Sequence, residues 1–386
     1  MRIVDVCAFY TPHGGGVRTY IDQKLALAEP LGHDITVIAP GTEDALIERG
    51  PSARIMTLRS PRLPVDRKYG YFDDEPAIHR ALDRLAPDFV EASSPWRSPV
   101  MVANWRPEVP KALIMHADPL SAYAYRWFGP FLERDTIDRR FDPFWRHLRR
   151  LGQSFDAVVC ANRDLSSRLQ AGGVVNVQTN PMGVQPGLFS PARRNEALRA
   201  RLLQHCGLGP DALLLVAAGR LAPEKRLPML AEAVTMAGRR RPIGLAIFGE
   251  GREKLSLWRA IAGNPHIRMM QPVRDRERFA TVLASADALL HGCEAETFCM
   301  AGAEARASGV PVIVPDQGGA AEFALQGGGI AYRAADRASL VEALLRFEPH
   351  SPDWQLHTAP RTMRAHFDDL FALYRRLQDN RQRSVA

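Results

Sequence analysis

The stretch that decides the fold is 295–322, AETFCMAGAEARASGVPVIVPDQGGAAE. It sets two carboxylates, Glu296 and Glu304, around an expected helix start. We expect Thr297 to be the N-cap and 299–308 to be helical, because the GVP sequence that follows is a strong C-terminal stop. The N-terminus of such a helix presents unpaired backbone N–H groups and the positive end of a dipole. This segment is therefore suited to bind a phosphate.

Outward from this stretch, short apolar runs alternate with longer helical patterns, which is typical of βαβ units with parallel sheets. The proline- and glycine-rich segment 180–191, NPMGVQPGLFSP, separates two such series and predicts a linker. We expect an α/β protein with domains at 1–187 and 188–358 and a C-terminal helix within 359–386 that crosses back to the first domain. The expected strands are 3–9, 35–39, 89–92, 112–116 and 157–161 in the first domain, and 213–218, 244–248, 267–270, 288–291 and 310–314 in the second.

The composition is that of a globular protein: 386 residues, of which 46% are hydrophobic and 24% are charged. No apolar run reaches the roughly 20 residues that span a bilayer, and 1–10 resembles a first strand more than a signal peptide. We therefore expect a cytoplasmic protein. The formal charge of +7 favours an anionic partner such as a nucleotide phosphate or a lipid headgroup.

The cysteines are five in number, scattered, and without metal-ligand spacing. We expect reduced thiols and no structural zinc site. The five are Cys7, Cys160, Cys206, Cys293 and Cys299.

Ligands of doubly wound sheets bind outside the carboxyl ends of the strands, so the strand-to-helix loops are the candidate sites. The loop 11–19 contains three consecutive glycines, and 219–225, GRLAPEK, contains Arg220 and Lys225. A third loop, 249–252, contains Glu250. Each has a simpler interpretation, a bare turn for the glycines and a solvated surface pair for the two cations, which the sequence leaves open.

Taken together and in this order, these motifs resemble those of the family-4 glycosyltransferases of the GT-B fold. The resemblance covers nearly the whole chain and implies two Rossmann-like, doubly wound domains facing across a cleft. It also implies a retaining, metal-independent enzyme without a cofactor. The residues that carry it are PHGGGVRTY, LGHDITVIAPG, HAD at 116–118, NPMGV with LFSP, GRLAPEK, FGEG, and E-x7-E followed by ASGVPVIVPDQGGAAE.

By that resemblance, Glu304 would bind the ribose hydroxyls, Glu296 a hydroxyl of the donor sugar, and Arg220 and Lys225 the diphosphate. His116 would lie near the reacting sugar, so that it joins Glu296, Arg220 and Lys225 as a catalytic residue. The remaining implied positions are Gly15, Gly16, Phe298, Cys299 and Met300, whose backbone would contact the phosphates and sugar, Glu250 on the donor side, and Asp118 as an acidic companion of His116.

Simpler structural roles stay open for several of these residues. His116 could be a packed core histidine and Asp118 a cap, and either glutamate could be a surface carboxylate. Cys299 stands where the family usually has glycine. We expect it to adopt ordinary helical dihedral angles, so that the helix survives.

The acceptor is suggested only by a basic and aromatic region. The segment 139–150 contains five arginines and His147 against one aspartate, interleaved with apolar residues, and 59–72 is a second such stretch. Basic amphipathic helices with aromatic residues can lie in a membrane interface, although a core helix with a solvated basic face is the simpler interpretation. The candidate acceptor or membrane residues are Asp118, Arg139, Arg140, Trp145, Arg146, Arg149 and Arg150.

We therefore expect transfer of a hexose from a nucleoside-diphosphate sugar, with UDP as the expected nucleotide, to a lipid such as diacylglycerol at the inner face of the cell membrane. One alternative is a soluble or polyprenyl-linked saccharide acceptor in polysaccharide biosynthesis. Another is a non-catalytic nucleotide-sugar-binding protein. Nucleic-acid binding is not expected, because no recognised binding module is present.

Overall fold

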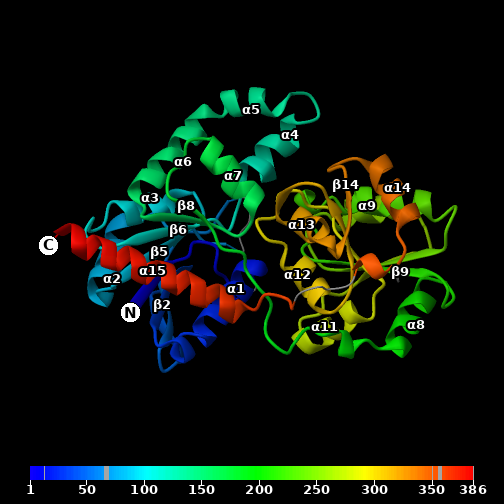
Figure 1. Cartoon of the computed structure of the whole chain (residues 1–386), viewed down its shortest axis with the longest axis horizontal. Coiled ribbons are helices and arrows are strands. Elements are labelled where there is room, and N and C mark those ends of the chain that lie inside the picture. Colours follow the sequence, from blue (N-terminus) through cyan, green and yellow to red (C-terminus); the bar gives the residue numbers. More distant parts are fainter. Residues whose placement is uncertain (13, 65–68, 350, 355–358, 386) are drawn as a thin grey trace. The chain divides into compact units, whose positions relative to one another are not determined.

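The chain folds into two α/β units (Figure 1). The computed structural model describes residues 1–12, 14–64, 69–349, 351–354 and 359–385. Unit 1 comprises Met1–Pro181 with Met363–Ala386, and unit 2 comprises Met182–Thr362. The sequence-based boundaries were 187/188 and 358/359, of which residue 358 lies outside the described residues. The chain thus passes from one unit to the other twice.

Unit 1 is built on an eight-stranded sheet of order β3-β4-β2-β1-β5-β6-β7-β8. Every pairing is parallel except that between β3 and β4. The central strands β1 and β5 are buried and mostly apolar, as expected for parallel strands whose two faces are covered, but each contains one buried carboxylate, Asp5 or Glu91. The strands are β1 (Arg2–Val6), β2 (Asp34–Gly41), β3 (Ala45–Gly50), β4 (Ala53–Arg59), β5 (Phe89–Ser93), β6 (Lys111–Ile114), β7 (Ala157–Cys160) and β8 (Val177–Thr179).

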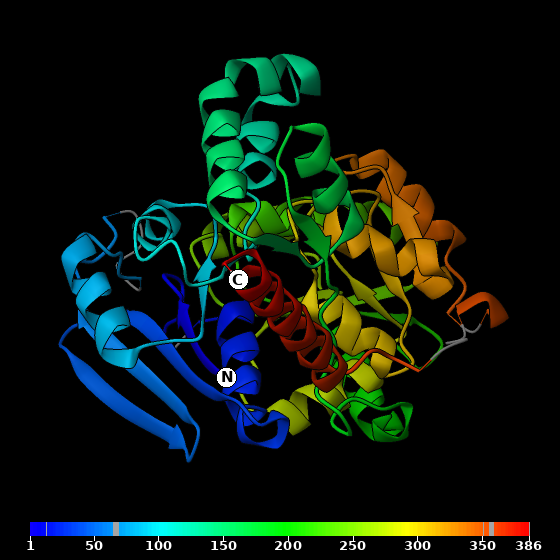
Figure 2. The same ribbon diagram turned by 60° about the vertical axis from the view of Figure 1, so that its left-hand side comes forward.

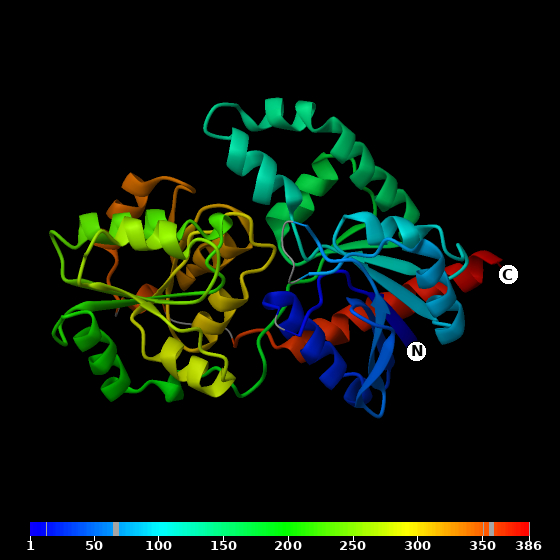
Figure 3. The ribbon, with the colours of Figure 1, turned by 180° about the vertical axis from the view of Figure 1, so that it is seen from behind.

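The helices of unit 1 follow its strands, and one pair projects beyond the sheet. The π-helical segment η2 (Leu120–Tyr125) runs directly into the short α4, and α4 and α5 stand out from the sheet in all three views (Figures 1, 2 and 3). The helices are α1 (Gly16–Ala26), α2 (Glu75–Leu85), α3 (Arg97–Ala103), α4 (Arg126–Phe128), α5 (Arg134–Arg140), α6 (Asp142–Ser154), α7 (Arg163–Ala171) and α15 (Met363–Val385), with the single turn η1 (Glu29–Leu31).

A buried ionic cluster fixes α1 to the centre of this sheet. Lys24 of α1 donates to Asp5 of β1 at 2.8 Å and to Glu91 of β5 at 2.5 Å, and all three side chains are fully buried. Burial raises the pKa of Glu91 to about 7, with Lys24 opposing the rise. Because Lys24 lies in the last turn of α1, the cluster holds the C-terminal part of this helix against β1 and β5.

The C-terminal helix α15 packs on unit 1, beside α1 (Figure 2). Its apolar face is buried and contacts the rest of unit 1 through aromatic side chains. The rings of Tyr374 and Phe89 stack with their centres 3.9 Å apart, and the ring centres of Phe367 and Tyr20 are 5.2 Å apart. The periodic apolar pattern of the sequence therefore corresponds to a helix that buries one face, as an amphipathic helix should.

Unit 2 is built on a six-stranded, fully parallel sheet of order β11-β10-β9-β12-β13-β14. The order reverses beside β9, which is the place where doubly wound sheets bind their ligands. The strands are β9 (Leu213–Ala218), β10 (Ile243–Phe248), β11 (Ile267–Met270), β12 (Ala288–Leu290), β13 (Val312–Pro315) and β14 (Gly329–Tyr332).

Helices cover both faces of this second sheet, with α9, α10 and α14 packed together on one face and α11 and α12 on the other (Figures 1 and 3). The helices are α8 (Glu196–His205), α9 (Leu227–Ala237), α10 (Lys254–Ile261), α11 (Arg276–Ala284), α12 (Met300–Ala307), α13 (Gly318–Phe323) and α14 (Arg337–Arg346). The shorter segments are η3 (Pro191–Arg193), η4 (Pro223–Lys225), η5 (Ala324–Gly328) and η6 (Pro352–Trp354).

Candidate active site

The start of α12 is the structural centre of the candidate site, and it differs from the sequence expectation in one respect. The N-cap is Cys299 and not Thr297. Cys299 has φ 71° and ψ 71°, so the prediction of ordinary helical dihedral angles was wrong. This left-handed conformation costs a residue with a Cβ atom about 1–2 kcal/mol, whereas glycine adopts it freely. The helix nevertheless begins at Met300, as its sequence favours.

No side chain caps the first turn of α12, and the same holds for α1, whose N-cap is Gly15 and whose first residue is Gly16, among the described residues. Other helices of the chain are capped by an Asn or Asp that accepts from the backbone N–H three residues on, as expected for N-caps. These are α2, α7, α8, α11 and α14. The absence of a side-chain cap does not distinguish α1 and α12, since α3, α4, α5, α6, α9, α10 and α13 lack one as well. The start of α12 is suited to an anion because it is a helix N-terminus that follows a strand-to-helix loop.

Glu296 lies at the centre of a charged cluster just before α12. It is in contact with the ammonium of Lys225, which is the last residue of η4, and lies 3.2 Å from Nε2 of His291, which follows β12. Burial alone would raise the pKa of Glu296, but Lys225 and His291 outweigh it, and the pKa lies well below its usual range. Glu296 is thus an ionised acceptor, and about a fifth of its side chain is exposed.

Glu304 lies one turn into α12 and is held by a residue that the sequence analysis did not select. Arg276, the first residue of α11, donates to Glu304 at 2.6 Å, and its guanidinium carbon lies 5.0 Å from the ring centre of Phe189. Burial raises the pKa of Glu304, and Arg276 opposes that rise. Only 4% of the Glu304 side chain is exposed, so Arg276 is its one charged contact among the described residues.

The strand-to-helix loops after β9 and β10 come close together at this edge of the sheet. A Cβ atom at Gly249 would lie 2.0 Å from the carbonyl oxygen of Gly219, so glycine is required there. Arg220 pairs with Glu224 at 3.0 Å, and more than half of its side chain is exposed. Glu250 lies 3.8 Å from Arg274, and its side chain is also exposed. Both predicted donor-binding side chains are therefore accessible.

Phe298 and Met300 lie directly before and after Cys299, the N-cap of α12. Phe298 is 9% exposed and packs edge-on against Phe323 at 5.8 Å. A Cβ atom at Gly319 would lie 2.8 Å from the backbone of Phe298, so the start of α13 rests directly on this turn. The turn that carries the predicted phosphate-binding amides therefore packs against both ends of α13.

The predicted residues of unit 1 lie in a separate group. His116 follows β6 and is buried, its ring 4.7 Å from that of Tyr20, and burial lowers its pKa to about 4. Asp118 is buried against Arg168 and also accepts from the backbone N–H of Ser121 at 3.2 Å. His116 is thus a neutral imidazole at neutral pH, and Asp118 acts as a cap and an ion-pair partner.

The arginine-rich helices differ from the amphipathic membrane helix that the sequence suggested. Trp145 is 6% exposed, and its indole N–H donates to Asp138 at 3.1 Å, so the prediction that it contacts a membrane was wrong. Arg146 and Arg149 pair with Asp142 at 3.1 Å and 2.9 Å, which compensates part of the basic charge. The remaining residues of the set, Arg139, Arg140 and Arg150, are exposed. The second basic stretch, 59–72, includes 65–68, which lie outside the described residues.

A group with possible metal ligands coincides with the Glu296 cluster. Ligand atoms of His291, Glu296 and Cys299 lie within 4.8 Å of one another. Burial raises the pKa of the Cys299 thiol well above its usual value, and the Glu296 carboxylate is bonded to the Lys225 ammonium. A protonated thiol and a carboxylate already paired with a cation are poor metal ligands, so this group fits an anionic or hydroxylated ligand better than a metal.

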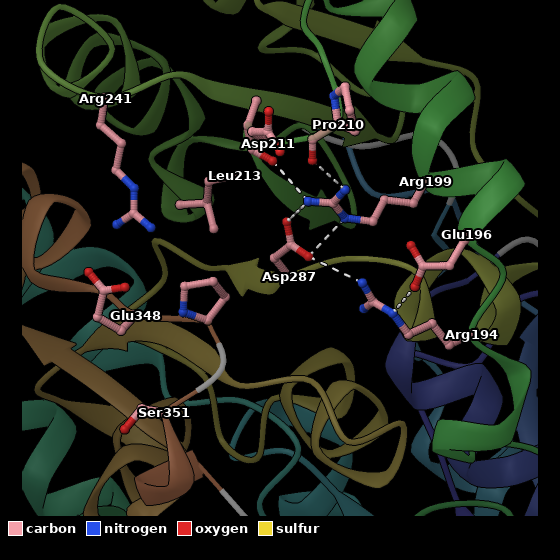
Figure 4. Close-up of a pocket in the computed structure, with 12 residues that line it drawn as sticks. Arg194, Glu196, Arg199, Pro210, Asp211, Leu213, Arg241, Asp287, Glu348 and Ser351 are labelled. Carbon is pink, nitrogen blue, oxygen red and sulfur yellow. Dashed lines mark hydrogen bonds and ion pairs between the residues drawn. The ribbon is translucent and has the colours of Figure 1, made fainter.

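A cavity of about 790 Å³ lies elsewhere in unit 2 (Figure 4). Leu213, the first residue of β9, lines it, so it lies at the amino end of the strands. Its charged groups satisfy one another: Asp287 accepts from Arg194 at 3.4 Å and from Arg199 at 2.8 Å. Because α/β sheets bind ligands at the other end, this cavity is not the candidate site.

Two site residues, Arg276 and His291, were missed by the sequence analysis. His291 was placed only at the end of an expected strand, although a polar residue directly after a buried apolar run is a usable signal. Arg276 lies in the arginine-rich sequence RDRER, and nothing local distinguishes it from Arg274 or Arg278.

Comparison with known proteins identifies both units. Residues 15–183 match the family model "Glycosyl transferase 4-like domain", and residues 204–353 match "Glycosyl transferases group 1". A GDP-mannose-dependent alpha-(1-6)-phosphatidylinositol dimannoside mannosyltransferase of Mycobacterium tuberculosis (strain H37Ra) is 32% identical over 322 residues, 81% of this chain and 79% of the relative. A GDP-mannose-dependent alpha-mannosyltransferase of M. tuberculosis (strain CDC 1551) is 28% identical over 374 residues, 92% of this chain and 88% of the relative.

Solved structures with the same fold extend over nearly the whole chain. Sucrose-phosphate synthase from Thermosynechococcus elongatus matches with a TM-score of 0.76 at 17% identity, covering 97% of this chain and 98% of its own. A glycosyltransferase involved in lipopolysaccharide biosynthesis matches with a TM-score of 0.63 at 16% identity, covering 98% of this chain and 99% of its own. At these identities the likeness shows the fold alone, which is the GT-B fold.

Proposed function

The chain belongs to the family-4 glycosyltransferases, enzymes of the GT-B fold, and on that premise we propose that it transfers mannose, with retention, from GDP-mannose to a hydroxyl group of a membrane glycolipid. The observation that carries the proposal is the cluster of Glu296, Lys225 and His291 before α12. It combines an ionised acceptor for sugar hydroxyls with a cation for a diphosphate.

The choice of GDP-mannose rests on the named relatives. The mycobacterial proteins are described as GDP-mannose-dependent, and one of them is named an alpha-(1-6)-phosphatidylinositol dimannoside mannosyltransferase. The sequence analysis favoured a UDP-sugar from the family at large, and no contact among the described residues of unit 2 selects between guanine and uracil. We therefore propose the donor of the more similar proteins, and a lipid that bears a polyol or sugar headgroup as the acceptor.

In the proposed reaction, the bond between the anomeric carbon of mannose and the β-phosphate oxygen of GDP breaks, and a bond from that carbon to the acceptor oxygen forms on the same face. The departing phosphate accepts the proton of the acceptor hydroxyl. In this proposal, Lys225, Arg220 and the N-terminus of α12 would stabilise the charge that gathers on the leaving diphosphate. Neutralisation by these groups needs no metal ion.

Glu304 and Glu296 would each bind a different part of the donor. Glu304, one turn into α12, would accept from ribose hydroxyls, and Glu296 from a hydroxyl of the sugar. Both carboxylates are held by cations in the unliganded protein, Glu304 by Arg276 and Glu296 by Lys225. Donor binding would therefore replace the ion pairs of these two carboxylates or add to them, and it would not bury an unpaired carboxylate.

The proposal is tested by GDP release in the presence of extracted membrane lipid, with GDP-mannose, UDP-glucose and UDP-galactose offered separately. We expect release from GDP-mannose to depend on the lipid and to persist in a chelator. Glu296→Gln should lower kcat/KM by about 100-fold, since one group that acts on the transition state is often worth about 3 kcal/mol. The control Glu232→Gln alters an exposed carboxylate paired with Arg337 and should behave as wild type. Full activity of Glu296→Gln would refute the site.

A further inference from the structure

Four aromatic side chains are exposed together where α4 and α5 project from unit 1. Tyr123, Trp127, Phe128 and Phe131, which we call the aromatic tip, are 46%, 54%, 40% and 83% exposed. They fall within nine residues of sequence, and the rings of Tyr123 and Trp127 lie 5.4 Å apart. Large apolar side chains that gather on an exposed surface mark an interaction site more often than scattered ones do.

The projecting segment, formed by η2, α4 and α5, is anchored to unit 1 by buried side chains. Leu120, Ala124 and Ile137 are each at most 3% exposed and join it to the core of unit 1. The hydroxyl of Tyr125 donates to Asp138 at 2.5 Å, and Asp138 also accepts from the indole of Trp145. The aromatic tip is therefore held outward by the buried side of the same helices.

The charges around the aromatic tip are mostly positive. The guanidinium carbon of Arg126 lies 5.7 Å from the ring centre of Trp127, and exposed Arg139 and Arg140 end α5. Arg134 also belongs to this region and packs over the ring of Tyr125 at 4.8 Å. The exposed acidic residues are Glu133 and Asp135. The surface therefore combines aromatic rings with an excess of arginine, which complements an anionic, amphipathic partner.

From this arrangement we propose that the aromatic tip inserts into the headgroup region of an anionic lipid bilayer, with Arg126, Arg139 and Arg140 contacting the lipid phosphates. Tryptophan and tyrosine rings suit the membrane interface because one end is apolar and the other polar, and arginine adds attraction to anionic lipids. A convex projection can enter a bilayer, whereas a site for a peptide or a helix is a groove. The proposal rests on the proposed function in that a membrane lipid is the acceptor.

The surface differs from the one that the sequence suggested. Trp145, on α6, is buried, and Arg146 and Arg149 of the same helix are paired with Asp142. In this region, the exposed aromatic residues that could contact lipid are thus those of η2, α4 and the turn that follows α4. Within the described residues, no helix has both the length and the apolar character needed to cross a bilayer.

The test is flotation of the full-length protein with vesicles of phosphatidylcholine, with and without phosphatidylinositol. We expect wild type to float with the anionic vesicles and the double variant Trp127→Ser/Phe131→Ser to bind them about tenfold less. The matched control is Trp258→Ser/Leu255→Ser, which removes two side chains of α10 that are 64% and 56% exposed. It should bind as wild type does. Equal binding of all three proteins, or no binding by wild type, would overturn the proposal.

Two further readouts separate this proposal from the proposed function. The aromatic tip variant should retain wild-type affinity for GDP, because its changes lie in unit 1 and alter none of the predicted donor-binding residues. If wild type binds vesicles through the tip but transfers no mannose, the function fails and the docking surface stands. If wild type is a dimer that the tip variant converts to a monomer, the tip is a protein interface and the bilayer proposal is wrong.

Discussion

Cys299 adopts a left-handed backbone conformation at the N-cap of α12, with φ 71°. We predict that Cys299→Gly raises the free energy of unfolding by about 1 kcal/mol, because glycine adopts this conformation without the steric cost that a Cβ atom imposes. Cys299→Ala keeps the Cβ atom and should not stabilise. Urea denaturation of the three proteins decides the matter. A glycine variant less stable than the alanine variant would show that the backbone strain is not real.

Arg276 is the second residue whose role the structure reveals. We predict that Arg276→Ala weakens binding of GDP, most strongly at low pH. Burial raises the pKa of Glu304 and Arg276 opposes that rise, so removing the guanidinium should raise the pKa further. The ionised carboxylate that accepts from ribose is then lost at a higher pH as the solution is acidified.

Calorimetric titration of GDP from pH 8 to pH 6 measures this effect. Arg276→Lys, which keeps the charge, should restore the wild-type pH profile, and the control Arg278→Ala changes an exposed arginine of the same helix. A uniform loss of affinity at every pH in Arg276→Ala would assign Arg276 a purely structural role.

For individual residues, the sequence could predict those that belong to a linear motif but not the side chains that they contact. Glu296, Glu304 and Lys225 stood out because E-x7-E and GRLAPEK carry them. Arg276 reaches Glu304 across 28 positions of sequence, a contact that only the packing of α11 against α12 creates. The dihedral angles of Cys299 were mispredicted because helix propensity does not report the conformation of a cap residue.

Among the secondary-structure elements, α1 depends on the buried cluster of Lys24, Asp5 and Glu91. We predict that Lys24→Met lowers the free energy of unfolding by about 3–5 kcal/mol, since removing one partner of a buried ion pair leaves an uncompensated charge. Lys254→Met, at an exposed position of α10, should change it by less than about 0.5 kcal/mol.

The loss of stability in Lys24→Met should also depend on pH. Burial raises the pKa of Glu91 to about 7 in the folded protein, above its usual 4.5. The folded state therefore binds the proton more tightly, and the contribution of Glu91 to stability falls as the pH rises between these values. Without Lys24 the pKa rises further, so the loss in Lys24→Met should be smaller at pH 5 than at pH 8. Urea denaturation of both proteins at the two pH values measures this loss of stability. A larger loss at pH 5 would contradict the raised pKa of Glu91.

The sequence predicted the elements whose pattern is set by burial on both faces. β9 is buried over nearly its whole length, and its bounds agree with the expected 213–218. The bounds of β11, an edge strand that is partly exposed, also agree with the expected 267–270. It missed β3, β4, β8 and β14: β3 is an exposed antiparallel edge strand, β8 has three residues, and β14 begins among glycines.

The aromatic residues of unit 1 show why helix faces were assigned wrongly. Periodicity shows that a helix is amphipathic but not whether a protein core or a membrane covers its apolar side. Trp145 is buried because Gly172 makes room for it: a Cβ atom there would lie 2.1 Å from the ring. That contact joins α6 to the end of α7 and has no local signal in the sequence.

At the scale of the whole molecule, the chain enters unit 2 after Pro181 and leaves it after Thr362. The two crossing segments pair side by side, since Val184 and Thr362 form a parallel bridge. A Cβ atom at Gly183 would lie 2.2 Å from the backbone of Thr362, so the NPMG sequence allows this close approach. The two doubly wound units and their order were predictable from the sequence, because each repeats the alternation of apolar strand and helix.

We propose that the protein, through the ionised cluster in unit 2, transfers mannose from GDP-mannose to a membrane lipid. The measurement that tests it most directly is incubation of the purified protein with GDP-mannose labelled in the sugar and vesicles of extracted membrane lipid, followed by partition into organic and aqueous phases. We predict that label enters the organic phase, that α-mannosidase but not β-mannosidase releases it, and that Lys225→Ala abolishes the transfer. Absence of label from the organic phase, or equal transfer by Lys225→Ala, would contradict the account.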